Sequence, residues 1–159
     1  MEEQFDFIEL KVPAKPEYVG VVRLSVSGIA NRLGFSYDDI EDMKVAISEA
    51  ITNAVKHAYN ETGEGEVTIG FGIYMNRLEI MVSDRGESFK LEEVKKEIGP
   101  YKETEDVRGL REGGFGLYLI HTLMDKVEIN NNSGVIVLMT KYLTENEVGF
   151  NGDQISTTQ

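Results

Sequence analysis

Glu49 and Asn53 are residues whose types and spacing suit chemistry, and they lie in the segment AISEAITNAVKHAY, residues 46–59. Plotted at about 100° per residue, the apolar side chains of this segment share one side and the two polar ones share the other. Residues at i and i+4 are about 5–6 Å apart on a helix. An asparagine oxygen is a hard ligand suited to Mg²⁺, and a neighbouring carboxylate can position or deprotonate an attacking hydroxyl group. A solvated outer face explains the same spacing, so both interpretations are open.

A second polar group stands at the end of an apolar strand pattern, in the segment SDRGES, residues 83–88. Asp84 accepts hydrogen bonds and suits an amino group such as that of adenine, and Gly86 permits a tight bend there. The alternative is a plain turn in which the aspartate side chain binds nearby backbone.

Glycines precede a helical pattern in the segment EGGFGLYLI, residues 112–120. Backbone N–H groups at Gly113, Gly114 and Gly116, together with the positive end of a helix, suit phosphate groups. The segment is not a dinucleotide-binding fingerprint, since no strand leads directly into it, and it is not a P-loop, since no Gly-Lys-Ser/Thr follows. Thr140, late in the last apolar strand pattern, has the ordinary interpretation of a β-branched strand residue.

Hydrophobic periodicity predicts the elements that must position these residues. Alternation predicts a strand over 7–14, a hairpin over 67–82 with its turn at 75–77, and strands over 126–130 and 134–142. Helical spacing predicts helices over 16–33, 37–59 and 91–98, and a further helix after the glycines at 113–116. The polar segment 99–112 has no period and is predicted to be a functional or mobile loop.

This order of elements predicts an α+β fold, a two-layer sandwich in which helices cover one face of a mixed, mainly antiparallel sheet. The length of 159 residues suits one domain. We predict that this domain spans residues 1–143 and that the polar segment 144–159 is a disordered tail.

Composition excludes several classes of function. The net charge of −12 argues against direct binding of nucleic acid or of anionic lipid. No run approaches the roughly 20 apolar residues of a membrane span. The absence of cysteine excludes disulfides and thiolate metal sites and favours a cytoplasmic location.

Taken together, the order and spacing of these motifs resemble the GHKL (Bergerat-fold) family of ATP-binding proteins. In that family's terms EAITN is the N box, DRG is the first glycine box and GGFG is the second. The resemblance covers residues from about 7 to 142. The segments KVPAKPEYVG, SEAITNAVKHAY, EGGFGLYLI and SGVIVLMTKYL are similar to the stand-alone anti-sigma factor kinases of Gram-positive bacteria.

The resemblance implies a role for each motif. Asn53 would hold Mg²⁺ between the phosphates of ATP, and Glu49 would act as the base toward a substrate serine. Asp84 would bind the adenine amino group, with Gly86 and Thr140 supporting that end. The loop 99–112 would act as a lid, and Gly113, Gly114 and Gly116 would contact the phosphates.

Two positions depart from the family pattern. Ser88 stands where the first glycine box often has a second glycine, and Glu112 stands where some relatives have a basic residue before the second box. Arg111 or Arg108 is therefore a candidate for contact with the γ-phosphate, and the sequence does not choose between them. Arg23, in the first predicted helix, is a candidate for contact with a sigma factor.

The implied function is an anti-sigma factor, expected to form a homodimer. It would sequester a sigma factor of the general-stress, sigma-B type, and use Mg-ATP to phosphorylate a serine of an anti-anti-sigma protein of the STAS type. Two alternatives are open: a nucleotide-dependent sigma-binding module without kinase activity, and an ATP hydrolase without a protein acceptor. The presence of Glu49 favours catalysis, because a pure binder has no need of a base.

Overall fold

The computed structural model describes residues 3–62, 65–84, 99–100, 114–130 and 136–144. The predicted helix over 91–98, most of the predicted lid and the predicted tail from residue 145 lie outside these ranges. Among the described residues, no helix is long and apolar enough to cross a membrane.

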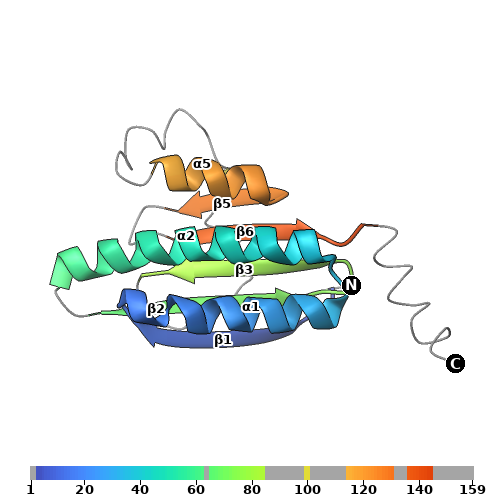
Figure 1. Ribbon diagram of the computed structural model, residues 1–159, viewed down its shortest axis with the longest axis horizontal. Helices are drawn as coiled ribbons and strands as arrows, with labels where there is room; N and C mark the ends of the chain where they lie inside the picture. Colours follow the sequence, from blue (N-terminus) through green and yellow to red (C-terminus); the bar gives the residue numbers. More distant parts are fainter. Residues whose placement is uncertain (1–2, 63–64, 85–98, 101–113, 131–135, 145–159) are drawn as a thin grey trace, which may run out of the picture.

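Six strands form one sheet in the order β1-β2-β3-β6-β5-β4, and Figure 1 labels all of them except β4. The strands are β1 (Asp6–Pro13), β2 (Glu66–Ile73), β3 (Arg77–Ser83), β4 (Gly99–Pro100), β5 (Lys126–Asn130) and β6 (Ile136–Tyr142). Every neighbouring pair of described strands is antiparallel. The β2–β3 hairpin was predicted, and Thr68 opposite Ser83 gives its register.

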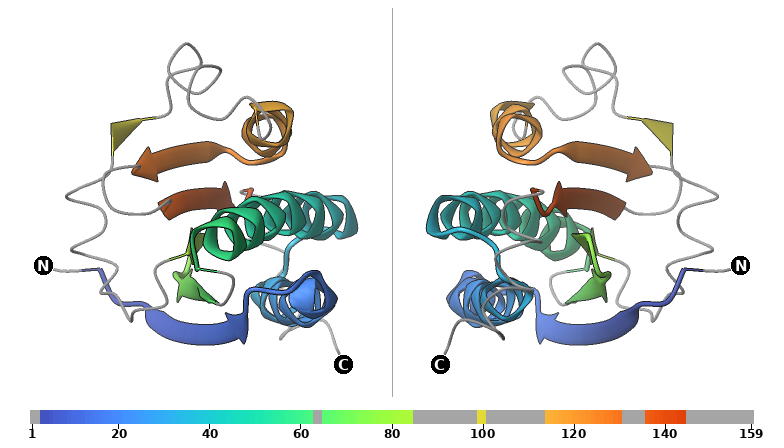
Figure 2. Two further views of the ribbon diagram at one scale, coloured as in Figure 1. Left: turned by 90° about the vertical axis from the view of Figure 1, so that its left-hand side faces the viewer. Right: turned by 90° about the vertical axis from the view of Figure 1, so that its right-hand side faces the viewer.

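The helices lie on one face of this sheet, as the end-on views of Figure 2 show. They are a short 3-10 helix η1 (Pro16–Tyr18), α1 (Val19–Leu33), α2 (Tyr37–Thr62) and α5 (Gly114–Leu123). Gly34 ends α1 in the left-handed conformation, with φ of 94°, which favours glycine. The hydroxyl oxygen of Ser36 accepts a hydrogen bond from the backbone N–H of Asp39 at 3.2 Å, so Ser36 caps the beginning of α2.

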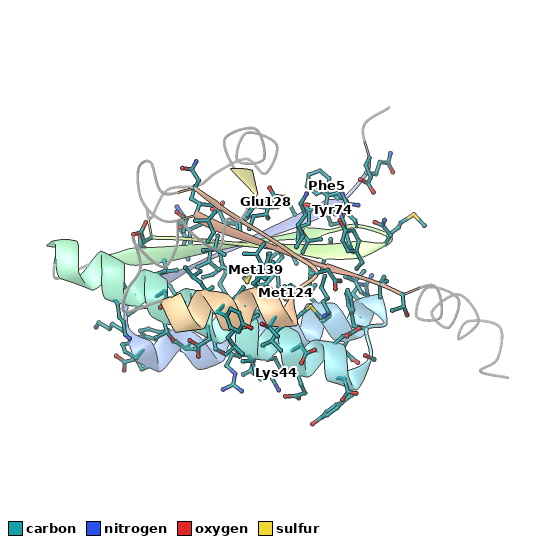
Figure 3. All side chains as sticks on the ribbon, turned by 90° about the horizontal axis from the view of Figure 1, so that it is seen from above. Phe5, Lys44, Tyr74, Met124, Glu128 and Met139 are labelled. Carbon is teal, nitrogen blue, oxygen red and sulfur yellow. The ribbon has the colours of Figure 1, made fainter. Side chains whose placement is uncertain are left out.

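Alternation along the strands separates an inner face, which the helices cover, from an outer face. The inner face carries the main core, to which β6 contributes Val137 and Met139. A smaller apolar cluster lies on the outer face: Tyr74, Met81, Ile136 and Leu138, with Phe5 packed against them. Figure 3 shows Met124 and Met139 between sheet and helices, while Phe5, Tyr74 and Glu128 lie on the other side.

The predicted α+β sandwich is confirmed, with two differences in detail. The sheet has no parallel pair among its described strands, where a mixed sheet was predicted. Gly99 and Pro100, predicted as the start of a loop, pair with Ile129 and Glu128 of β5. A two-residue strand has no detectable period, and proline is tolerated there because β4 is an edge strand.

Candidate functional site

The first turn of α5 lies directly against the polar stripe of α2. A Cβ atom built on Gly116 would lie 3.0 Å from Oε2 of Glu49 and 3.4 Å from Nδ2 of Asn53. Helix α5 begins only two residues earlier, at Gly114. Two motifs separated by more than 60 residues in the sequence are therefore in contact.

The contact explains why glycine stands at position 116. A side chain there would approach the carboxylate of Glu49 more closely than ordinary van der Waals contact allows, so either α5 or Glu49 would have to move. Gly28 in α1 offers a contrast, because a Cβ atom built there has nothing within 4 Å. The glycine at 116 thus serves a close approach between helices, whereas the glycine at 28 does not.

Asn53 has an unsatisfied polar atom at this contact. Its Nδ2 atom is buried and has no hydrogen-bond partner among the described residues. An unpaired buried amide costs free energy comparable to that of a lost hydrogen bond. Such a group is retained where a ligand supplies the partner. Glu49 is half-buried beside it, so a carboxylate and an amide face the N-terminal turn of α5 together.

Asp84 follows β3 at the same end of the molecule. The end of β3 pairs with the beginning of β2 through Ser83 and Thr68, and β2 follows the C-terminal end of α2. In Figure 1 the arrowhead of β3, the C-terminal half of α2 and the start of α5 all lie toward the same side. Asp84 is half-buried there, and its predicted contact with adenine stays a prediction.

Thr140 is not brought together with Glu49 and Asn53. Along β6, Val137 and Met139 belong to the inner core, so Thr140 points to the outer face, where it is opposite Glu79 of β3. Its predicted role near the adenine has no support from this geometry. Arg23 lies exposed on α1, as the prediction of a partner contact requires.

Gly86, Arg111 and Gly113 lie outside the described residues, and so does Arg108, so their predicted contacts stay predictions. Gly114 is the first residue of α5, which is the position where a free backbone N–H group is available to a phosphate.

The donor set around Asn53 fits a magnesium ion that is held mainly by a nucleotide. No group of three or more His, Cys, Asp or Glu side chains suited to a metal occurs among the described residues. Magnesium usually keeps several waters and takes one or two protein ligands plus phosphate oxygens. One asparagine beside a glycine-lined helix end meets that description.

Comparison with known proteins identifies the class of protein that this fold and site define. The family described as histidine kinase-like ATPase domain matches residues 12–141, which is most of the chain. That range holds Glu49, Asn53, Asp84 and Gly116. The range begins at the last two residues of β1 and ends one residue before the end of β6.

Individual relatives narrow the class. A serine-protein kinase RsbW of Oceanobacillus iheyensis is 65% identical over 155 residues, covering 98% of both chains. The serine-protein kinase RsbW of Bacillus subtilis is 54% identical over 148 residues, covering 93% of this chain and 92% of its own. That of Bacillus cereus ATCC 14579 is 55% identical over 157 residues. The chain belongs to the RsbW family of serine-protein kinases, within the histidine kinase-like ATPase domains.

One polar residue close to these helices was not predicted. Lys141 of β6 has the parity of Val137 and Met139, so it points to the inner face, where it is 9% exposed. The sequence signal that could have identified Lys141 is its place in the alternation of inward-facing apolar residues along the strand. No motif includes it, and a lysine near the end of a strand is usually exposed.

Proposed function

We propose that this protein is an ATP-dependent serine-protein kinase that also acts as an anti-sigma factor. It binds a sigma factor of the sigma-B type and releases it in favour of an anti-anti-sigma protein, which it phosphorylates on serine. The observation that carries the proposal is the contact of Gly116 with Glu49 and Asn53. Membership of the RsbW family supports it, because the relatives are named serine-protein kinases.

The chemistry is phosphoryl transfer, in which positioning and charge stabilisation supply most of the catalysis. The serine hydroxyl oxygen forms a bond to the γ-phosphorus of ATP while the bond from that phosphorus to the β,γ-bridging oxygen breaks. The electron pair of the broken bond leaves with ADP. The hydroxyl proton passes to the carboxylate of Glu49, which is the general base.

The residues of this chain hold the reactants for that step. The N-terminal turn of α5 offers backbone N–H groups to the phosphates. Asp84 accepts a hydrogen bond from the adenine amino group. Asn53 is the residue that would hold Mg²⁺, which supplies charge neutralisation on the phosphates when it is bound. Glu49 stands one turn before Asn53 on the same helix face, within reach of the same phosphate group.

Replacement of Glu49 tests the proposal. The protein is incubated with ATP labelled at the γ-phosphate, Mg²⁺ and the anti-anti-sigma protein of the same organism. Glu49→Gln keeps the shape and removes the base, so we expect kcat to fall by about 10²- to 10⁴-fold. The affinity for ADP should stay within about twofold, because ADP lacks the transferred phosphate.

The matched control is Glu41→Gln, which changes a glutamate of the same helix. Glu41 forms an ion pair with Lys44 at 3.1 Å and stands about two helical turns before Glu49 on α2, so transfer should continue at the wild-type rate. Transfer by Glu49→Gln at that rate would remove Glu49 from the mechanism.

The same assay separates the two alternatives. A sigma-binding module without kinase activity would bind nucleotide and sigma factor but transfer no label in the wild type. An ATP hydrolase would release labelled phosphate at a rate independent of the anti-anti-sigma protein.

The proposal also includes a cytoplasmic location and a homodimer. Fractionation of cells tests the location, and light scattering of the purified protein tests the dimer.

A further inference from the structure

Lys141 joins three elements at the end of α5 that is remote from Gly116. Its Nζ atom donates a hydrogen bond to the backbone oxygen of Leu123, the last residue of α5, at 2.8 Å. The same atom lies 3.8 Å from Oδ1 of Asp39 in the first turn of α2, and 3.8 Å from Oδ1 of Asp125. A nearly buried ammonium group is retained only where such partners surround it.

The partners of Lys141 are themselves fixed. Asp125 accepts a hydrogen bond from the backbone N–H of Tyr142 at 2.7 Å and donates its own backbone N–H to the oxygen of Thr140 at 3.0 Å. Asp39 belongs to the capped first turn of α2. The last carbonyl groups of a helix have no partner within the helix and carry partial negative charge. Lys141 supplies both the hydrogen bond and the opposite charge for α5.

Helices α2 and α5 are therefore held against each other at two places. At one place Gly116 touches Glu49 and Asn53. At the other, Lys141 links Leu123 to Asp39. Since α5 has only 10 residues, it is about 15 Å long, and a displacement at its C-terminal end moves its first turn as well.

We propose that Lys141 is a positioning residue for the nucleotide site. Its ammonium group fixes the C-terminal end of α5 on the first turn of α2 and so holds Gly116 against Glu49 and Asn53. Its effect on nucleotide binding rests on the proposed function, whereas its effect on the contact at Gly116 does not. Lys141 itself touches neither nucleotide nor substrate.

A double-mutant cycle between Lys141→Met and Gly116→Ala tests the proposal. In the wild type, an added methyl group at position 116 meets Glu49, so Gly116→Ala should weaken both folding and the binding of a fluorescent ADP analogue. Without the ammonium group, α5 can move away from α2 and admit the methyl group. We therefore expect the fold-change in ADP affinity caused by Gly116→Ala to be at least fivefold smaller in the Lys141→Met background.

Residues this far apart ordinarily behave independently. Effects of substitutions more than about 7–10 Å apart add to within about twofold, and seven residues of helix, about 10 Å, separate position 116 from Leu123. Additivity of the two substitutions within twofold, in both ADP affinity and unfolding equilibrium, would overturn the proposal. Lys141→Met alone should lower kcat/KM for phosphoryl transfer by about tenfold to a hundredfold, which is the effect of misplacing a site by up to about 1 Å.

Two controls keep the result specific. Gly28→Ala adds a methyl group to a helix where nothing is within 4 Å, so it should combine additively with Lys141→Met. Lys126→Met removes a lysine of the same sheet that faces outward, and it should leave the effect of Gly116→Ala unchanged. If Lys141→Met does not fold, Asp39→Asn keeps the hydrogen bond to Leu123, removes one charge and enters the same cycle.

The measurements distinguish failure of the proposed function from failure of the positioning role of Lys141. A wild-type protein that binds no ADP would refute nucleotide binding, and the unfolding measurements alone would then decide the role of Lys141. A wild-type protein that binds ADP, combined with an additive cycle, would refute the positioning role and leave the kinase proposal intact.

Discussion

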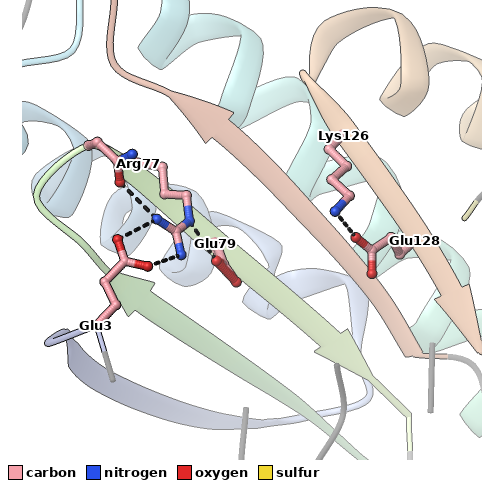
Figure 4. Close-up of polar contacts among 6 residues, drawn as sticks. Glu3, Arg77, Glu79, Lys126 and Glu128 are labelled. Atoms are coloured by element: carbon pink, nitrogen blue, oxygen red, sulfur yellow. Dashed lines mark hydrogen bonds and ion pairs between the residues drawn. The ribbon is translucent and has the colours of Figure 1, made fainter. Parts of the chain in front are cut away.

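The two faces of the sheet use buried polar groups for different purposes. On the outer face, Arg77 donates hydrogen bonds to Glu3 and to Glu79, each at 2.8 Å (Figure 4). Its guanidinium also lies 3.7 Å from the ring centre of Tyr74. These contacts tie the N-terminal segment to β3. On the helix side, Asn53 keeps an amide nitrogen without a described partner. The group on the outer face is held together by hydrogen bonds within the chain, whereas the amide of Asn53 faces the first turn of another helix.

An unsatisfied atom alone does not identify a functional site. The hydroxyl oxygen of Thr68, on the outer face, is also buried without a described hydrogen-bond partner. Asn53 differs because a carboxylate lies beside it and because the glycine of another helix lies across from it. Convergence of two helices, together with an unsatisfied polar atom, therefore marks the site.

The largest effect on stability is expected for Arg77→Met, which removes the hydrogen bonds that Arg77 donates to Glu3 and Glu79 on the outer face. Glu79 is 3% exposed, and removal of the partner of a buried charge typically costs about 3–5 kcal/mol of unfolding free energy. The pKa of Arg77 is raised, chiefly by its hydrogen bond to Glu3, so the cation persists at every working pH. Urea unfolding of the nucleotide-free protein measures the loss.

The comparison predicts that Arg77→Met leaves the ADP affinity of the folded protein unchanged within about twofold. Arg32→Met, on the exposed side of α1, is the matched control and should cost less than about 1 kcal/mol. A tenfold loss of ADP affinity in Arg77→Met, measured where the protein is fully folded, would show that the outer face belongs to the site.

Asn53→Ala should weaken nucleotide binding without lowering stability, which is the opposite of the result expected for Arg77→Met. Loss of a hydrogen-bonding or metal-binding side chain should weaken Mg-ATP binding by about 10- to 100-fold. The unfolding free energy should stay the same or rise by about 0.5 kcal/mol, because alanine favours helix and no buried amide is left unpaired. Titration calorimetry and urea unfolding measure the two quantities. A less stable protein with unchanged Mg-ATP affinity would mean that Asn53 is a structural residue.

The elements were largely predictable because each carries a local signal. The α2 helix follows from its apolar stripe and the Ser36 cap, and the hairpin follows from alternation around residues 75–77. The face that Thr140 occupies was not predictable, because the run GVIVLMTKYL is apolar on both sides and alternation then gives no direction. The strand β4 was missed because two residues carry no period.

The site was predictable only in part. The polar stripe of α2 indicated Glu49 and Asn53, but periodicity does not say which distant segment lies across from them. Only the resemblance to a known family linked them to Gly116. The anchoring of α5 by Lys141 depends on three elements that are distant in sequence, and no spacing rule connects Asp39 with Leu123.

The smallest effect is expected for Lys126→Met, which tests whether the outer face is separate from the site. Lys126 forms an ion pair with Glu128 at 2.7 Å, and its side chain is 56% exposed, so we expect a loss of less than about 1 kcal/mol. The hydrogen bond to Glu128 raises the pKa of Lys126.

A raised lysine pKa in the folded state stabilises the protein fully below the unfolded value of about 10.4 and loses that effect as the pH rises through the folded value. The difference between wild type and variant should therefore be constant from pH 7 to about pH 9 and vanish at higher pH, as urea unfolding at several pH values would measure. Lys126 is directly opposite Thr140 in the β5–β6 register. A loss of ADP affinity in Lys126→Met, at unchanged stability, would therefore indicate that Thr140 lies near the nucleotide. It would contradict the inference that the outer face is separate from the site.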